Sequence, residues 1–583
     1  MVFYIDKFES MIEPAARIGV FESEDLIFNT IGTISDFILY KICDIISKQP
    51  LVTRKVLKMK IDITKKYLAI PVCHSAEQVR VLFRSEGKTV FDLDIRLDPE
   101  KYDAIYYVDF RRFIGQTFDV VGAPEGMADF GQADEPEYTG IYDEPRRPIA
   151  HFTAKMGWIN DPNGCIKLGD TYHLYYQHNP CGRWWGNMHW GHATSKDLMH
   201  WEEHDIALFP DETGTMYSGS AWLDKENVSG LGTKENPAVL FFYTASGGEN
   251  AISEGKSYIQ CLAYSLDQGK TLIKYDKNPI LGHEVAANRD PLINYSEEMG
   301  CYIMALYLVD NEFALYKSDN LLDWTKTDQI TLPDAAECPD FFKLKVDGED
   351  KSFWVLTGAH DAYLVGDLSA EGKFTPVQGG IKLHYGNSSY AAQSYSEIDD
   401  GRRIKIAWAN GDIPGQNFNC AMTTPTELTL KHLGDQYVLC AMPVKELELL
   451  YKKTEKAEPQ AIKEGQSASF KTEGKANNIK LNIKSGRKIK IDFLGQVINI
   501  DNHGCYANIG DCYMPTYLTE DGVQMRIVSD TNGCEIYCGV GQSFAGVNFV
   551  SDYDKTDFVI TAVEGDIELT QLEITPLANI WKE

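Results

Sequence analysis

The sequence predicts an all-β protein, because short strand-like runs separated by turn residues recur along most of the chain. The runs are densest between residues 149 and 430, where aromatic residues are frequent and helical periodicity is almost absent; 172–176 and 239–243 are examples. Two segments of this stretch, 197–201 and 320–324, both end in Leu-x-x-Trp or a close variant. This faint internal repeat is typical of a β-propeller, although the sequence alone does not give the number of blades.

Composition and charge limit the classes of partner. A chain of 583 residues exceeds one ordinary hydrophobic core, so about two to four domains are expected. The 56 Lys and Arg residues are outnumbered by 85 Asp and Glu residues, which gives a net charge of −29. Nucleic acid and anionic membranes would be repelled by this charge, so neither is expected as a partner. A neutral ligand such as a sugar is compatible with it.

The cysteines and the N-terminus bear on the compartment. The 13 cysteines are scattered, odd in number and include no CxxC pair. Cys43, Cys165, Cys261 and Cys301 lie among apolar residues and are predicted to be buried thiols, a usage that favours a reducing compartment. No basic stretch followed by an apolar one opens the chain, so no secretory signal is predicted. We therefore expect a cytoplasmic enzyme, or an extracellular one if a signal has been removed.

The chain is predicted to begin with a helix and a small β-sandwich. Isoleucines recur at three- and four-residue steps in residues 1–52, and Pro50 ends the predicted helix. Its apolar face is expected to pack on the next domain, with a homo-oligomer contact as the alternative. Residues 53–130 show alternating strands typical of a small β-sandwich. Residues 131–148, rich in Pro, Gly and acidic residues, are predicted to be a linker.

Two further strand-rich domains are predicted after the linker. Residues 149–430 form the aromatic-rich region described above. Residues 431–583 alternate apolar residues with outward Lys residues, which predicts a second β-sandwich. Within it, residues 452–466 are rich in Lys, Glu and Ala and are predicted to be a connector.

Three acidic motifs lie in order inside the aromatic-rich region. The first is WINDPNG at residues 158–164, where a turn between two strands is expected around Asp161. The second is NRDP at residues 288–291, and the third is ECPD at residues 337–340. Each motif taken singly is compatible with a turn, an ion pair or a solvated loop.

Together the three motifs resemble the acidic blocks of glycoside hydrolase family 32, the invertases, inulinases and levanases. The resemblance extends through WGNMHWGH at 185–192, YSGS at 217–220 and YAAQ at 390–393, and it is dense over residues 140–430. It implies a five-bladed β-propeller catalytic domain with the site at one end of the central channel. A small N-terminal β-sandwich with a leading helix and a C-terminal β-sandwich would flank this domain.

The resemblance also implies roles for the three acids. Asp161 is the candidate nucleophile, and nearby amide donors are expected to hold its pKa low. Glu337 is the candidate general acid and base, so it must carry a proton in the first step. Asp290 is expected to bind two fructosyl hydroxyls and to stabilise the transition state. Three carboxylates in one pocket repel one another, and Arg289 is the cation available to neutralise them.

Further side chains match positions that line the fructose subsite of the family. The substrate-binding candidates are Asn160, Gln177, Trp185, Tyr217, Ser218, Arg289, Cys338, Tyr390 and Trp408. Relatives often carry an acidic residue where this chain has Ser388, which puts leaving-group recognition there in doubt. His178, His189 and His192 are better explained by packing than by a metal, so neither a metal site nor a cofactor is expected.

The sequence therefore predicts a retaining β-fructosidase that releases terminal fructose from sucrose, fructo-oligosaccharides, inulin or levan. One alternative is a fructosyltransferase, or an enzyme that forms or cleaves difructose anhydrides, with the same chemistry and a sugar hydroxyl in place of water. A second is a non-catalytic fructan-binding protein, although such proteins usually lack one of the acids. A third is an arabinan- or xylan-cleaving propeller, which the complete WINDPNG motif disfavours. The β-2,1 or β-2,6 preference and exo or endo action are left open.

Overall fold

A computed structural model describes residues 56–582 of the chain. The predicted helix before Pro50, and the homo-oligomer contact suggested for it, lie outside the described residues. Within the described range the regular elements are strands, apart from three short 3-10 helices: η1 (Arg111–Phe113), η2 (Ala251–Ser253) and η3 (Lys445–Leu450). No helix in this part of the chain has the length and apolar character that crossing a membrane requires.

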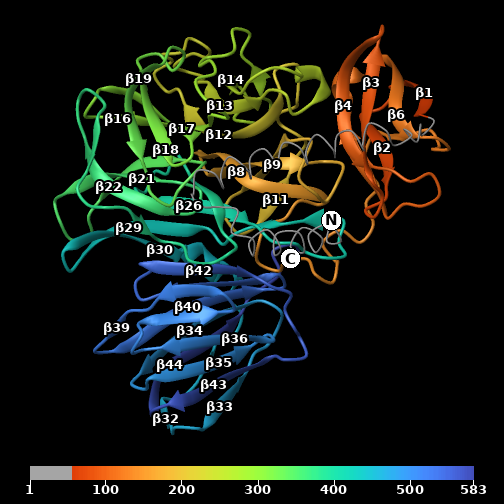
Figure 1. The fold of residues 1–583 in the computed structure, drawn as a ribbon. Coiled ribbons are helices and arrows are strands. Elements are labelled where there is room, and N and C mark those ends of the chain that lie inside the picture. The colour runs from red at the N-terminus through yellow and green to blue at the C-terminus, as the bar shows by residue number, and fades with distance from the viewer. Residues whose placement is uncertain (1–55, 583) are drawn as a thin grey trace, which may run out of the picture. The chain divides into compact units, whose positions relative to one another are not determined.

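Two small sheets form the first sandwich (Figure 1). The alternating strands predicted within residues 53–130 are confirmed. One sheet has the order β1 (Val56–Asp62), β6 (Thr117–Pro124), β3 (Gln78–Ser85), β4 (Lys88–Arg96), and the other β5 (Ala104–Asp109), β2 (Tyr67–Val72), β7 (Gly131–Ala133). The segment predicted to be a linker contains strand β7, whose backbone pairs with β2. The sandwich has a core of its own, rich in phenylalanine.

Five antiparallel sheets follow one another along residues 157–443 and form the blades of a β-propeller (Figure 1). The first contains β8 (Gly157–Leu168), β9 (Thr171–Asn179), β10 (His189–Ser195) and β11 (Trp201–Glu203). The second contains β12 (Thr215–Leu223), β13 (Val239–Ser246), β14 (Ile259–Ser265) and β15 (Ile273–Lys274). The third contains β16 (Arg289–Ser296), β17 (Cys301–Val309), β18 (Glu312–Ser318) and β19 (Thr325–Thr331).

The last two blades carry extra short strands. The fourth contains β20 (Asp340–Lys345), β21 (Ser352–Thr357), β22 (Ala362–Leu368) and β23 (Phe374–Pro376), and β24 (Ile381–Lys382) also pairs with β22. The fifth contains β25 (Tyr390–Ser394), β26 (Arg403–Ala409), β29 (Thr426–Leu433) and β30 (Gln436–Pro443), and β28 (Ala421–Met422) also pairs with β26. The fifth blade therefore continues past residue 430.

The first strands of the five blades form a closed ring. Strand β8 contacts β12, β12 contacts β16, β16 contacts β20, β20 contacts β25, and β25 returns to β8. Closure is reinforced by β27 (Phe418–Asn419), which follows the fifth blade's second strand in the chain and pairs in parallel with β8 of the first blade. The ring brings residues far apart in sequence to one central channel, as the family resemblance implied.

The turn predicted at residues 158–164 is wrong. The segment lies inside β8, which continues to Leu168. Two register shifts in its pairing with β9, between Ile159 and Pro162 and between Asn163 and Ile166, absorb the turn-forming residues as β-bulges. Asn, Asp and Pro favour turns locally, but pairing on the blade overrides that preference here.

Two larger sheets form the C-terminal sandwich (Figure 1). The first contains β31 (Glu455–Lys456), β44 (Ile567–Pro576), β34 (Asn477–Lys484), β40 (Gly522–Asp530), β41 (Gly533–Cys538) and β42 (Ser543–Asn548), with β32 (Gln460–Ile462) and β39 (Leu518–Thr519) on its sides. The second contains β33 (Ser467–Lys471), β43 (Asp557–Glu564), β35 (Lys488–Phe493), β36 (Gln496–Asp501), β37 (Tyr506–Ile509) and β38 (Cys512–Pro515). The predicted connector 452–466 thus contributes β31 and β32, which pair with β44.

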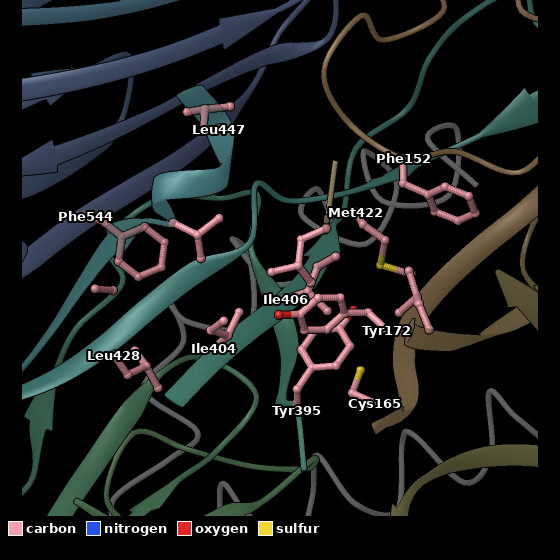
Figure 2. Close-up of a cluster of buried hydrophobic side chains, with 14 of the residues drawn as sticks. Phe152, Cys165, Tyr172, Tyr395, Ile404, Ile406, Met422, Leu428, Leu447 and Phe544 are labelled. Carbon is pink, nitrogen blue, oxygen red and sulfur yellow. The ribbon is translucent and has the colours of Figure 1, made fainter. Parts of the chain in front are cut away.

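One hydrophobic cluster is shared by the propeller and the C-terminal sandwich (Figure 2). Tyr172 and Tyr395 pack edge to face with ring centroids 5.7 Å apart. Leu447 of η3 and Phe544 of β42 belong to the same buried cluster. The sandwich therefore adds to the core beneath the propeller, while a second cluster fills its own interior.

Candidate active site

The first strands of the blades are distorted at the level where the predicted site residues lie. Register shifts occur in β8 after Ile159, in β12 after Met216, in β16 after Arg289 and in β25 after Tyr390. A bulge turns a side chain out of the regular alternation and re-aims it. Gly219 shows how tight one bulge is, because a Cβ there would lie 1.8 Å from the carbonyl oxygen of Phe242.

The bulges and loops bring the three predicted acids to one pocket. Asp161 comes from β8, Asp290 from β16, and Glu337 from the segment directly before β20. Asp290 and Glu337 have left-handed backbone conformations, with φ of 66° and 56°, and Cys338 follows with φ of 40°. Non-glycine residues avoid this region unless the surrounding structure holds them there, and such positions cluster at functional sites.

Asp161 is surrounded by neutral hydrogen-bond donors. Ser218 Oγ donates to Asp161 Oδ2 at 2.6 Å, and Gln177 Nε2 donates to the same oxygen at 3.2 Å. Asn160 Nδ2 lies 3.1 Å from Oδ1. Burial raises the pKa of Asp161, the bonds from Ser218 and Asn160 lower it, and the charge of Glu337 raises it again. The net direction is upward, so the prediction of a depressed pKa is wrong; donors alone do not offset burial beside other carboxylates.

A chain of bonds fixes the amide side chains around Asp161. Trp158 Nε1 donates to Asn160 Oδ1 at 2.9 Å, and Asn160 Nδ2 donates to Gln177 Oε1 at 2.9 Å. Gln177 Nε2 then donates to Ser218 Oγ at 2.6 Å. Each amide orientation is set by its neighbour, so the donors face the carboxylate without reorganising.

Asp290 is the most deeply enclosed of the three acids, with 5% of its surface exposed. Its Oδ2 accepts the backbone N–H of Cys338 at 3.0 Å and lies 3.5 Å from the Cys338 thiol. Its own N–H donates to Thr244 Oγ1 at 2.9 Å. Burial raises the pKa of Asp290 to about 7, against the lowering effect of Arg289 and with further raising by Glu337 and Asp161.

Glu337 has charged and phenolic partners instead of amides. Arg289 Nη2 donates to Glu337 Oε1, and the Tyr390 hydroxyl donates to Oε2. Arg289 also lies 3.8 Å from Asp290 Oδ2, and its guanidinium stacks over the Tyr307 ring at 4.7 Å. Arg289 is therefore the cation between two of the acids, as the sequence predicted.

The structure brings most of the predicted binding residues to this pocket, whose open volume is about 950 Å³ including its mouth. It is lined by Asn160, Asp161, Gln177, Trp185, Tyr217, Tyr258, Ala287, Arg289, Asp290, Glu337, Tyr390 and Trp408. Ser218 and Cys338 are not among these lining residues, but both contact Asp161: Ser218 Oγ donates to Asp161 Oδ2, and the Cys338 thiol lies 3.7 Å from the same oxygen. Tyr258 and Ala287 were not predicted, because neither belongs to a motif.

Ser388 does not line this pocket. Its side chain is buried, and its N–H donates to the Gly546 carbonyl of β42 at 2.9 Å. Ser388 is instead part of the contact with the C-terminal sandwich, and a role of this position in leaving-group recognition stays a prediction. His178 and His189 hydrogen-bond backbone carbonyls, and His192 hydrogen-bonds His173.

A pocket with two carboxyl groups in different surroundings, a third buried acid, an amide cluster and tryptophan walls is suited to cleaving a bond between sugars. The fold and this site together define a glycoside hydrolase of the β-propeller type.

Comparisons with known proteins agree with this class. Residues 151–443 match the sequence model described as the glycosyl hydrolases family 32 N-terminal domain. A levanase of Bacillus subtilis (strain 168) is 32% identical over 499 residues, which cover 76% of this chain and 72% of that protein. An extracellular exo-inulinase of Aspergillus awamori is 27% identical over 526 residues, covering 76% of this chain and 97% of that protein. The chain belongs to glycoside hydrolase family 32.

The fold agrees as well. A crystal structure of the exo-inulinase from Aspergillus awamori superposes with a TM-score of 0.68 at 25% identity. The alignment covers 76% of this chain and all of that one.

Proposed function

We propose that the protein is a retaining β-fructosidase that releases terminal fructose from fructans and sucrose. The observation that carries the proposal is the placing of Asp161 and Glu337 on one pocket with different partners. Neutral donors surround Asp161, whereas Arg289 and Tyr390 hold Glu337. Glycoside hydrolysis needs two carboxyl groups with such separate tasks.

In the first step an Asp161 oxygen forms a bond to C2 of the fructosyl unit. The bond between C2 and the bridging oxygen breaks, and the proton of the Glu337 carboxyl group passes to that oxygen. A fructosyl-enzyme ester and a free alcohol result. Asp290, which is fixed by the Cys338 N–H, accepts hydrogen bonds from fructosyl hydroxyls as positive charge develops on the ring.

In the second step Glu337 removes a proton from water, and the water oxygen bonds to C2. The ester bond breaks, fructose leaves, and both carboxyl groups return to their starting forms. Arg289 and the Tyr390 hydroxyl, which both donate to Glu337, hold its carboxyl group in the pocket during this step.

The relatives support fructans as substrates, because the matched proteins are named a levanase and an exo-inulinase. The predicted cytoplasmic location stays a prediction. The cysteines of residues 56–582 are all free, which supports a reducing compartment, whereas the matched exo-inulinase is extracellular by name.

The test is product analysis with sucrose, 1-kestose, inulin and levan. The proposal predicts free fructose from at least one substrate and, in methanol–water mixtures, a methyl fructoside of β configuration. Products of the α configuration would contradict the retaining mechanism. Longer oligomers or anhydrides with little free fructose would show that the enzyme transfers the fructosyl unit to a sugar hydroxyl instead of to water. Binding without any product would make the pocket a receptor.

A further inference from the structure

Two loops at the pocket mouth are held by the small N-terminal sandwich. One loop follows β9 and carries Trp185; the other follows β13, contains η2 and leads to Tyr258. Both Trp185 and Tyr258 line the pocket. Both loops are bound from behind by the hairpin of β3 and β4, which belongs to the sandwich and not to the propeller.

The first loop is built into the sandwich core. Cys181 is fully buried within that core, and Trp184 packs against it with the Arg96 guanidinium 4.6 Å from its ring. Asn187 then pairs with the backbone of β4: its Oδ1 accepts the Asp94 N–H, and its Nδ2 donates to the Asp94 carbonyl, both at 2.8 Å. Trp185 lies between these anchors and is 47% exposed. The anchors turn this side chain to the pocket.

The second loop is held by a buried carboxylate. Asp92 Oδ2 accepts the N–H of Ala251 in η2 at 3.0 Å, and only 8% of Asp92 is exposed. Arg80 donates to the Glu249 carbonyl at 3.3 Å and is itself fixed by two bonds of 2.8 and 2.7 Å to Asp94. Burying a carboxylate is costly unless hydrogen bonds or a cation compensate for the lost hydration. Here the hydrogen bond comes from the loop of the second propeller blade, and Arg80 Nε lies 3.7 Å from Asp92 Oδ2.

The residues at the ends of these loops form a polar aromatic wall. The Tyr258 hydroxyl donates to Glu249 Oε1 at 2.9 Å, and the Tyr258 ring meets Tyr217 edge to face at 5.5 Å. Tyr217 in turn meets Trp185 at 6.2 Å. Glu249 is exposed, in contrast to Asp161 and Glu337, which are half-buried, and to Asp290, which is buried. Exposed aromatic faces beside a carboxylate suit a sugar ring and its hydroxyls.

We propose that Tyr258 and Glu249, beside the fructose-subsite residues Trp185 and Tyr217, form a subsite for the sugar on the leaving side of the cleaved bond, and that the small sandwich positions it. Asp92 and Asp94 are positioning residues, since they act through the two loops. This inference rests on the proposed function, in which the inner acids hold the fructosyl unit. The group recognised is a hydroxyl-bearing sugar ring, and the sandwich is a specificity element of the active site.

The test compares two substrates with the same fructosyl unit, 1-kestose and p-nitrophenyl β-fructofuranoside. The p-nitrophenyl group has no hydroxyl that could donate a hydrogen bond to Glu249. In Asp92→Ala the loop loses its anchor, and kcat/KM for 1-kestose is expected to fall at least about fivefold more than that for the aryl fructoside, chiefly through KM. Asp92→Asn keeps an oxygen acceptor for the Ala251 N–H and is expected to restore the wild-type ratio. Asp119→Ala, an exposed carboxylate on β6 of the same sheet, is the matched control.

The inference is overturned if Asp92→Ala lowers kcat/KM for both substrates by one common factor, or leaves the ratio of the two kcat/KM values unchanged. If Asp92→Ala does not fold, Tyr258→Phe replaces it: this variant removes the hydroxyl that bonds Glu249, so an unchanged ratio in it overturns the inference equally. Failure of the wild type to release fructose from any substrate removes the proposed function together with the inference. Wild-type release with unchanged variant ratios removes the inference alone.

Discussion

A buried histidine joins the propeller to the C-terminal sandwich. His151, just before β8, places Nδ1 2.7 Å from Asp530 Oδ2, and its Nε2 lies 3.6 Å from Glu535 Oε1. Thr424 Oγ1 is 3.1 Å from the same Nε2. Burial alone would lower the pKa of His151, but the hydrogen bonds and charges of Asp530 and Glu535 raise it to about 10. The imidazolium form is therefore part of the folded structure at neutral pH.

The size of the effect follows from linkage between protonation and folding. Each pKa unit corresponds to about 1.4 kcal/mol, so a rise from 6.5 to about 10 amounts to about 5 kcal/mol. Removing one partner of a buried charge pair costs about 3–5 kcal/mol, which is the same order. Since the folded pKa of His151 is raised, its contribution is fully present below pH 6.5 and is lost as the pH rises towards 10.

We predict that His151→Gln lowers the free energy of unfolding by about 3–5 kcal/mol at pH 6, and that the deficit shrinks with rising pH. Urea unfolding at pH 6, 7.5 and 9 measures the difference between wild type and variant. His432→Gln, which removes an exposed histidine paired with Glu349, is the control and should cost less than about 1 kcal/mol. A deficit for His151→Gln that stays constant or grows between pH 6 and 9 would refute the reasoning.

Three further predictions follow from the pocket and from one close backbone contact. The pKa of Asp290 is about 7 in the folded protein and 3.8 in the unfolded chain, so the stability of the wild type falls as the pH rises from 3.8 to 7. Asp290→Asn should therefore be more stable than the wild type at pH 8 by at least about 1 kcal/mol, and by less at pH 4, as Tm will show. The same variant should release no fructose. Arg289→Gln removes the cation among the acids and should lower kcat at least about a hundredfold; a loss under threefold contradicts this role. Gly386→Ala places a Cβ 1.8 Å from the Gly546 carbonyl oxygen and should cost about 3 kcal/mol or more in urea unfolding, whereas Gly379→Ala, with open space around it, should be nearly neutral.

The strand pattern carried most of the fold prediction. Alternation marked the strands of the small sandwich, and aromatic runs marked β9 and β13 of the propeller. The count of blades came from the family resemblance, because ring closure depends on β8 meeting β25 and β27, more than 200 residues away, and no local pattern encodes that contact.

Local propensity failed where tertiary pairing decides. The WINDPNG motif has the residues of a turn, yet the backbone pairs with β9 through two bulges. The composition of this motif indicates a departure from a regular strand, but it does not distinguish a bulge from a turn. Here the bulge is what carries Asp161 into the pocket.

The site was predictable as a set and not residue by residue. Asp161, Asp290 and Glu337 each had an ordinary alternative explanation, and only their order in three motifs singled them out. Tyr258 was missed because it directly precedes β14 (Ile259–Ser265) and belongs to no motif. The direction of the Asp161 pKa was mispredicted because sequence shows the neighbouring donors and not the burial that outweighs them.

In the proposed mechanism Asp161 attacks the fructosyl carbon. The most direct test of this attack is fructose release by Asp161→Asn, an isosteric change that keeps the contacts with Ser218 and Gln177 feasible and removes the nucleophile. We predict a loss of about a thousandfold or more in kcat on every substrate that the wild type cleaves, the aryl fructoside included, with Tm unchanged or raised. Retention of more than about a tenth of the wild-type kcat on any of these substrates would contradict it.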